Sequence, residues 1–99
     1  MRLSEHSRTL IREAVQEVFG AEASVRLFGS RTDDGARGGD VDLLVESKLP
    51  VADRERKILQ LTARLQLRMG DQPIDVLVLD PETKRGAVHE RALQTGVPL

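Results

Sequence analysis

The chain has 99 residues, of which 39% are hydrophobic and 31% charged, a balance typical of a small soluble globular domain and not of a disordered segment. Cysteine is absent, which excludes a disulfide-bonded scaffold and a cysteine-ligated zinc site. Lysine and arginine number 15 against 16 acidic residues, so the net charge of −1 gives no general attraction to nucleic acid or to an anionic membrane. At this length we expect one domain, over residues 1–99.

The start of the chain and its hydropathy favour a cytoplasmic protein. Glu5 stands where a signal peptide would have its apolar region, and no apolar run approaches the roughly 18 residues that cross a membrane. The aromatic residues are Phe19 and Phe28, which leaves little for stacking single-stranded bases. Direct binding to nucleic acid or to a membrane is therefore not expected.

The first half of the chain predicts a helix and two strands. Ser4 is a suitable N-cap for a helix over 5–19, where apolar residues recur at helical spacing. A short strand is expected over 24–28, and the polar segment 29–39, with four of the eight glycines, reads mostly as a loop. The apolar run over 41–46 predicts the second strand.

The second half predicts two helices on either side of a strand. Apolar spacing favours a helix over 52–69 and a strand over 74–79. Pro81 is expected to open a last helix over 83–95. The order α-β-β-α-β-α predicts an α/β (α+β) fold, in which a small mixed sheet of three core strands packs against helices.

Three aspartates fall at the starts of apolar strands. Asp40 and Asp42 are two residues apart, so strand periodicity puts both carboxylates on one face, where a hard cation such as Mg²⁺ would relieve their repulsion. Asp75 opens another apolar strand, and it would join them if strands 41–46 and 74–79 run parallel. Three converging carboxylates are enough for two metal ions. The alternative is a set of solvated or salt-bridged acids at strand edges.

The end of the strand over 24–28 offers groups for phosphate. Gly29 lets a ligand approach the backbone, and a helical turn starting at Ser30 would present free N–H groups to an anion. These groups face the carboxylates only if this strand runs antiparallel to the next one. Arg31 and Arg37 in the same loop could pair with phosphate oxygens, or could be solvated loop arginines. Hydrogen-bond donors to phosphate, placed beside two magnesium ions, are typical of a nucleoside triphosphate site.

These residues together resemble the DNA polymerase beta-like nucleotidyltransferase superfamily, and most of all its minimal nucleotidyltransferase (MNT) branch. One mild departure is Gly39, because many relatives have serine immediately before the first acid. The resemblance implies a mixed sheet packed with helices. It is carried by Phe28-Gly29-Ser30-Arg31, by Arg37-Gly38-Gly39-Asp40-Val41-Asp42-Leu43-Leu44 and by Ile74-Asp75-Val76.

The resemblance also implies roles for the site residues. Gly29 and Ser30 would hold the triphosphate, and Asp40 and Asp42 would bind both Mg²⁺ ions. Asp75 would bind the catalytic metal and help to activate the acceptor hydroxyl. The reaction implied is transfer of a nucleoside monophosphate, AMP from ATP, with pyrophosphate leaving.

Members of this branch are often encoded beside a helical HEPN-type protein in toxin–antitoxin modules, where the nucleotidyltransferase is the antitoxin and in some cases adenylylates the toxin. The resemblance therefore implies a protein acceptor encoded by a neighbouring gene. A domain this small would leave its substrate half exposed, which favours completion by a partner or by self-association. The alternative is a catalytically silent module that neutralises its partner by forming a complex.

The predicted second helix carries a basic stripe, for which two interpretations stay open. It could contact RNA, a nucleotide or an acidic partner, or it could be an ordinary solvated helix face. The stripe consists of Arg54, Arg56, Lys57, Arg64 and Arg68.

Overall fold

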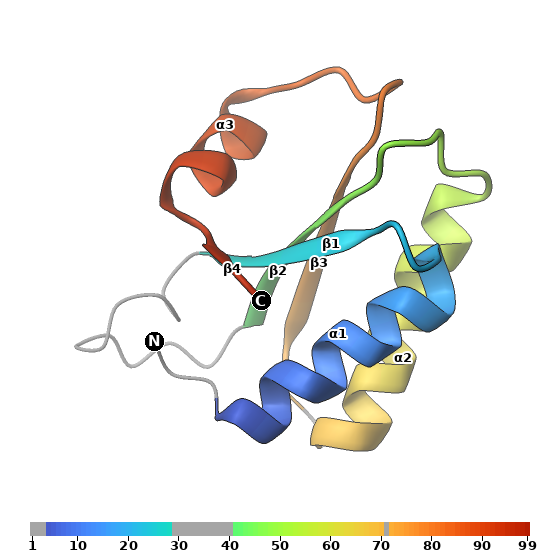
Figure 1. Ribbon diagram of the computed structural model, residues 1–99, viewed down its shortest axis with the longest axis vertical. Helices are drawn as coiled ribbons and strands as arrows, with labels where there is room; N and C mark the ends of the chain where they lie inside the picture. The colour runs from blue at the N-terminus through green and yellow to red at the C-terminus, as the bar shows by residue number, and fades with distance from the viewer. Residues whose placement is uncertain (1–3, 29–40, 71) are drawn as a thin grey trace.

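The structure is a computed structural model that describes residues 4–28, 41–70 and 72–99 (Figure 1). Within these ranges three helices and a four-stranded mixed sheet form an α+β fold, as the sequence predicted. The elements in chain order are α1 (Glu5–Phe19), β1 (Ser24–Phe28), β2 (Val41–Glu46), α2 (Arg54–Met69), β3 (Ile74–Leu79), α3 (Ala87–Thr95) and β4 (Val97–Pro98).

The sheet has the strand order β3-β2-β1-β4. β1 runs antiparallel to β2, whereas β2 and β3 are parallel and are joined through α2. Both orientations are those that the site hypothesis required. The sequence reading of three strands missed β4, a two-residue strand that pairs antiparallel with β1 at the sheet edge. Its Pro98 has no N–H to donate, which an edge strand tolerates.

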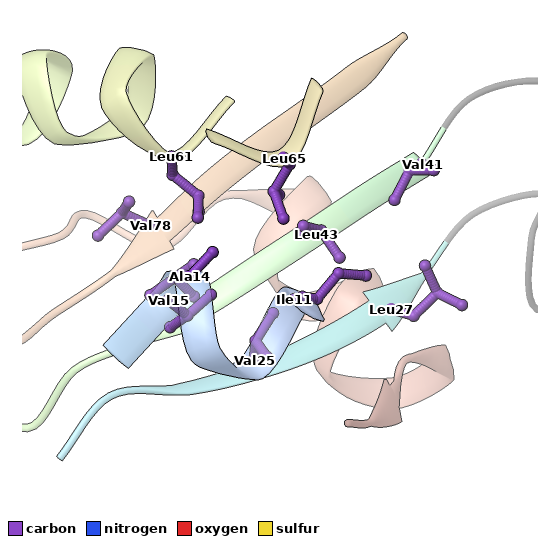
Figure 2. Packing of buried hydrophobic residues seen from close by; sticks show 11 residues of the cluster. Ile11, Ala14, Val15, Val25, Leu27, Val41, Leu43, Leu61, Leu65 and Val78 are labelled. Atoms are coloured by element: carbon purple, nitrogen blue, oxygen red, sulfur yellow. The ribbon is translucent and has the colours of Figure 1, made fainter. Parts of the chain in front are cut away.

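The main core lies between the sheet and the two long helices. Ser4 caps α1 by accepting a hydrogen bond from the backbone N–H of Ser7 at 3.1 Å. The apolar side of α1 packs against β1, and the apolar side of α2 packs against β2 and β3 (Figure 2). The buried members are Ile11, Ala14, Val15, Val25, Leu27, Val41, Leu43, Val45, Leu61, Leu65 and Val78.

A second, smaller core lies on the opposite face of the sheet, where α3 packs. Leu44, Leu79 and Ala92 are buried there. Because β2 is covered on both faces over this stretch, its sequence is an almost continuous apolar run and not an alternating one. α1 and α2 therefore lie on one side of the sheet and α3 on the other (Figure 1).

The second helix begins two residues later than predicted. The residue before it, Asp53, has φ 51° and ψ 47°, a left-handed conformation that cannot continue a right-handed helix. The N–H of Val51 is used elsewhere, because it donates to the Asp80 carboxylate at 2.8 Å. α2 therefore starts at Arg54 and not at residue 52.

The last helix begins at Ala87, so the prediction of residues 83–95 was wrong at its start. Thr83 is held in a turn, since its N–H donates to the Asp80 carbonyl at 3.0 Å and its hydroxyl to the Asp80 carboxylate at 2.9 Å. Gly86 then precedes the helix, and its N–H donates to His89 Nδ1 at 3.1 Å. Pro81 therefore follows β3 in a turn and opens no helix.

A bifurcated ion pair joins α1 to α2. Glu17 Oε1 accepts from Arg64 Nη1 at 2.6 Å and from Arg68 Nη2 at 2.7 Å. Both hydrogen bonds lower the pKa of Glu17, and the one from Arg68 has the larger effect. Two of the five basic residues of the α2 stripe are thus engaged with α1, so the stripe is at least partly structural.

We expect Glu17→Gln to lower the thermal midpoint by a few degrees at most, because the pair is exposed and screened by water. The difference from the unchanged protein should shrink as salt is added, since salt weakens exposed ion pairs. Because the pKa of Glu17 is lowered, the contribution should also vanish on acidification through that pKa. Thermal unfolding at low and high salt measures this; a difference that is insensitive to salt would contradict it.

Candidate active site

The candidate site lies at the sheet edge where β1 ends and where β2 and β3 begin. Phe28 pairs with Asp42 across β1 and β2, and Asp42 pairs with Asp75 across β2 and β3. Side chains of paired residues point to the same face of a sheet, about 4.8 Å apart from strand to strand. The two carboxylate side chains are therefore immediate neighbours on adjacent strands.

Strand periodicity identifies the face that carries them. Leu44 and Leu77, each two residues further along its strand, belong to the smaller core under α3. Asp42 and Asp75 thus lie on the α3 side of the sheet, but nearer its edge. Asp42 is half-buried and Asp75 is exposed. The site is consequently open to a ligand from solvent on this face.

The chemistry of the pair suits a divalent cation. Two carboxylates at opposed positions of neighbouring strands repel each other, and a cation between them removes that cost. Carboxylate oxygens are the ligands that Mg²⁺ prefers. Over residues 4–28, 41–70 and 72–99, no three acidic or histidine side chains gather into a metal-binding cluster. Asp42 and Asp75 are two of the three carboxylates that the sequence predicted as metal ligands.

The structure brings together only part of the predicted site. Asp42 and Asp75 meet as expected. The other predicted site residues lie outside the described ranges, although the ends of β1 and β2 that flank them meet at the same edge. These are Gly29, Ser30, Arg31, Arg37 and Asp40.

The same sheet face carries an ion pair at its other end. Arg26 Nε donates to Glu46 Oε1 at 2.6 Å, and each side chain is about 30% exposed. Glu46 lies four residues along β2 from Asp42, roughly 13 Å at the rise of a strand. Glu46 therefore has a structural partner and takes no part in the acid pair.

A cavity of about 300 Å³ opens near Glu46, between the ends of β2 and β3 that are remote from the acid pair. Ser24, Ser47, Lys48 and Arg85 line part of it. Because it is at the wrong end of the strands, it contributes nothing to the candidate site.

Sequence reasoning missed the buried carboxylate of Asp80, whose side chain has no exposed surface. It accepts hydrogen bonds from Val51 N, Thr83 Oγ1, Arg54 Nη2 and Glu82 N, at 2.8 to 3.0 Å. These hydrogen bonds lower the pKa of Asp80 to about 2, and the one from Val51 N–H has the largest effect. Burial acts in the opposite direction. The signal was present in the Asp-Pro dipeptide after an apolar strand, which favours a turn. Asp80 anchors the chain between β2 and α2.

Residues 8–94 match the family model described as a nucleotidyltransferase domain. The match spans most of the chain, so the chain belongs to this family, and nucleotidyl transfer is its class of activity. Domains of this kind generally use a nucleoside triphosphate and a divalent metal ion. None of the curated proteins compared with the chain matches it.

The helices offer no membrane anchor in the part of the chain that is described. None of α1, α2 and α3 is long and apolar enough to cross a bilayer.

Proposed function

We propose that this protein is a minimal, cytoplasmic, Mg²⁺-dependent nucleotidyltransferase of the MNT type, which transfers AMP from ATP to a hydroxyl group of a partner protein. The partner we propose is a HEPN-type toxin encoded by a neighbouring gene, for which this chain is the antitoxin. The observation that carries the proposal is the pairing of Asp42 with Asp75 on adjacent parallel strands, in a chain that belongs to the nucleotidyltransferase family.

The donor set fits the metal, because both side chains of the pair are hard oxygen ligands. Asp42 would hold two Mg²⁺ ions together with Asp40, and Asp75 would hold the ion nearer the acceptor. Bound there, the ions would neutralise the charge of the triphosphate and of the leaving pyrophosphate. Gly29 and Ser30 would contact the triphosphate.

The transfer itself is an in-line displacement. The acceptor hydroxyl oxygen attacks the α-phosphorus of ATP, the bond to the bridging oxygen of the β-phosphate breaks, and pyrophosphate leaves with its electron pair. The carboxylate of Asp75 accepts the hydroxyl proton. The exposure of Asp75 supports this role, since a protein side chain must be able to reach it.

The test is incubation of the protein with its co-encoded neighbour, ATP and Mg²⁺, followed by intact-mass spectrometry of both chains. We expect the neighbour to gain the mass of one or more AMP units. The double variant Asp40→Asn/Asp42→Asn, and a reaction in which the ATP carries a non-hydrolysable α,β-methylene bridge, are expected to give no gain.

The outcome separates the proposal from the alternative of a silent binding module. If the unchanged protein forms a stable complex with the neighbour but adds no mass, the proposed transferase role is wrong and neutralisation by binding takes its place. If the double variant still protects cells from the toxin, protection does not depend on transfer.

A further inference from the structure

Two apolar side chains border the acid pair on the same face of the sheet. Phe28 is paired with Asp42 across β1 and β2, so its ring points to the face that carries both acids. Leu77 follows Asp75 by two residues on β3 and therefore points to that face as well. Both side chains pack against the smaller core under α3. Phe28 and Leu77 thus form an apolar rim beside the acid pair.

α3 passes behind the acid pair and leaves the rim partly uncovered. Ala92 packs with Leu44 in the middle of the sheet, whereas a Cβ atom at Gly96 would lie 3.3 Å from Arg26 Cβ on β1. The helix therefore runs toward β1 as it crosses this face, and it buries Leu44 completely. The two rim side chains, by contrast, are only half-buried. Apolar surface consequently remains accessible next to the acids.

The in-line course of the proposed transfer limits where the nucleoside can lie. The residues proposed to contact the triphosphate follow Phe28 directly in the sequence, which puts the leaving pyrophosphate on the β1 side of the acid pair. The acceptor approaches on the β3 side, where Asp75 is exposed. Because the attacking and leaving oxygens are in line, their axis runs across the strands and the ribose projects away from it. The direction along the strands toward α3 leads over the apolar rim.

We propose that the apolar rim binds the nucleoside part of the substrate, with the base packed against Phe28 and Leu77. This inference rests on the proposed function, since it places the base relative to an α-phosphate held at the acid pair. The base and the ribose are the uncharged parts of a nucleoside triphosphate, so an apolar surface suits them and not the phosphates. The Phe28 ring offers a face on which a base can stack, and Leu77 adds apolar contact area.

The spacing of the strands agrees with this placement. Leu77 lies about 7 Å along β3 from Asp75, and Phe28 lies one strand, about 4.8 Å, from Asp42. In a nucleotide whose α-phosphate is held at the acids, the base lies one sugar ring away, which is a distance of the same order. A single nucleotide can therefore reach from the acid pair to the rim while α3 keeps its position.

The test compares ATP with inorganic tripolyphosphate, which has three phosphates but no nucleoside. Isothermal titration calorimetry of the full chain with Mg²⁺, and with no acceptor protein, measures both dissociation constants. We expect ATP to bind at least about ten-fold more tightly than tripolyphosphate. Leu77→Ala and Phe28→Leu should each weaken ATP binding about three- to ten-fold and leave tripolyphosphate binding unchanged. Unchanged binding of tripolyphosphate also shows that each variant is folded.

Two further variants serve as controls. Val76 is the neighbour of Leu77 on β3, but it points to the other face of the sheet and packs against the main core. Val76→Ala should therefore leave the binding of both ligands unchanged. Asp42→Asn should weaken the binding of both, because it removes a proposed metal ligand that the two ligands share.

The outcomes separate this inference from the proposed function. If the unchanged protein binds ATP no more tightly than tripolyphosphate, the inference is wrong and the proposed function stands. If the rim variants bind ATP normally but raise KM for the partner protein, the rim belongs to the acceptor and the inference is again wrong. If neither ligand binds, the proposed function fails and this inference fails with it.

Discussion

Replacing Asp42 with asparagine is expected to reduce nucleotidyl transfer by roughly three orders of magnitude, because it removes a charged oxygen ligand from the proposed metal pair. Asparagine has the same shape, so the strand pairing of β2 with both neighbours should persist. The loss should therefore appear as a fall in kcat and not as unfolding. Transfer of label from ATP labelled at the α-phosphate to the proposed partner protein measures the rate, and circular dichroism checks the fold.

The matched control is Glu46→Gln, which makes the same chemical change on the same strand and the same sheet face. Glu46 pairs with Arg26 at the far end of β2, so this variant should keep nearly full activity. If Asp42→Asn is as active as Glu46→Gln, the acid pair has no part in the reaction. A second readout is the binding of Mn²⁺ with ATP, which should weaken in Asp42→Asn and not in Glu46→Gln.

The placement of the acid pair could be predicted from the sequence, because few strand topologies are compatible with the apolar runs and connections around Asp42 and Asp75. The apolar runs around Asp42 and Asp75 mark two buried strands, and the helix between them is long enough for a crossover. Such a crossover makes the strands parallel and brings their starts to one edge. The short connection after β1 favours the antiparallel orientation in the same way. Local pattern and chain connectivity were sufficient here.

The predictions that failed concern helix starts and a two-residue strand, which the spacing of apolar residues along the chain does not show. Thr83 looked like the start of a helix, but Asp80 holds it in a turn. The predicted second helix included Asp53, but the left-handed backbone conformation of this residue excludes it from a right-handed helix. β4 consists of Val97 and Pro98 and has too little sequence to show a strand pattern. None of these follows from spacing along the chain.

The basic stripe of α2 shows the same limit for function. On the sequence, Arg64 and Arg68 lie one turn apart and are as suitable for RNA as for solvent. Only the packing of α1 beside α2 brings Glu17 between them. A charge pattern on one helix therefore predicts a surface, but its use is decided by the neighbouring helix.

Replacing Asp80 with asparagine is expected to be the most destabilising single change of a polar residue in the described chain. Both carboxylate oxygens accept hydrogen bonds, so the amide group of asparagine must face a donor such as Val51 N–H. Arg54 loses its anionic partner as well. We expect the thermal midpoint to fall by roughly 10 °C. Thermal unfolding at neutral pH measures it, and Asp53→Asn is the control, because asparagine tolerates the left-handed backbone of that residue.

The pH dependence of the stability difference between the two proteins distinguishes the loss of a charge from a packing defect. Hydrogen bonds lower the pKa of Asp80 to about 2, and the one from Val51 N–H has the largest effect. An aspartate in an unfolded chain has a pKa of about 3.9. The carboxylate therefore stabilises the fold fully above the unfolded pKa, and the contribution is lost as the pH falls toward 2. The gap between the unchanged protein and Asp80→Asn should accordingly be constant near neutrality and shrink below about pH 4. A gap that stays the same down to pH 2 would mean that the asparagine acts through lost packing and that the charge of Asp80 contributes nothing.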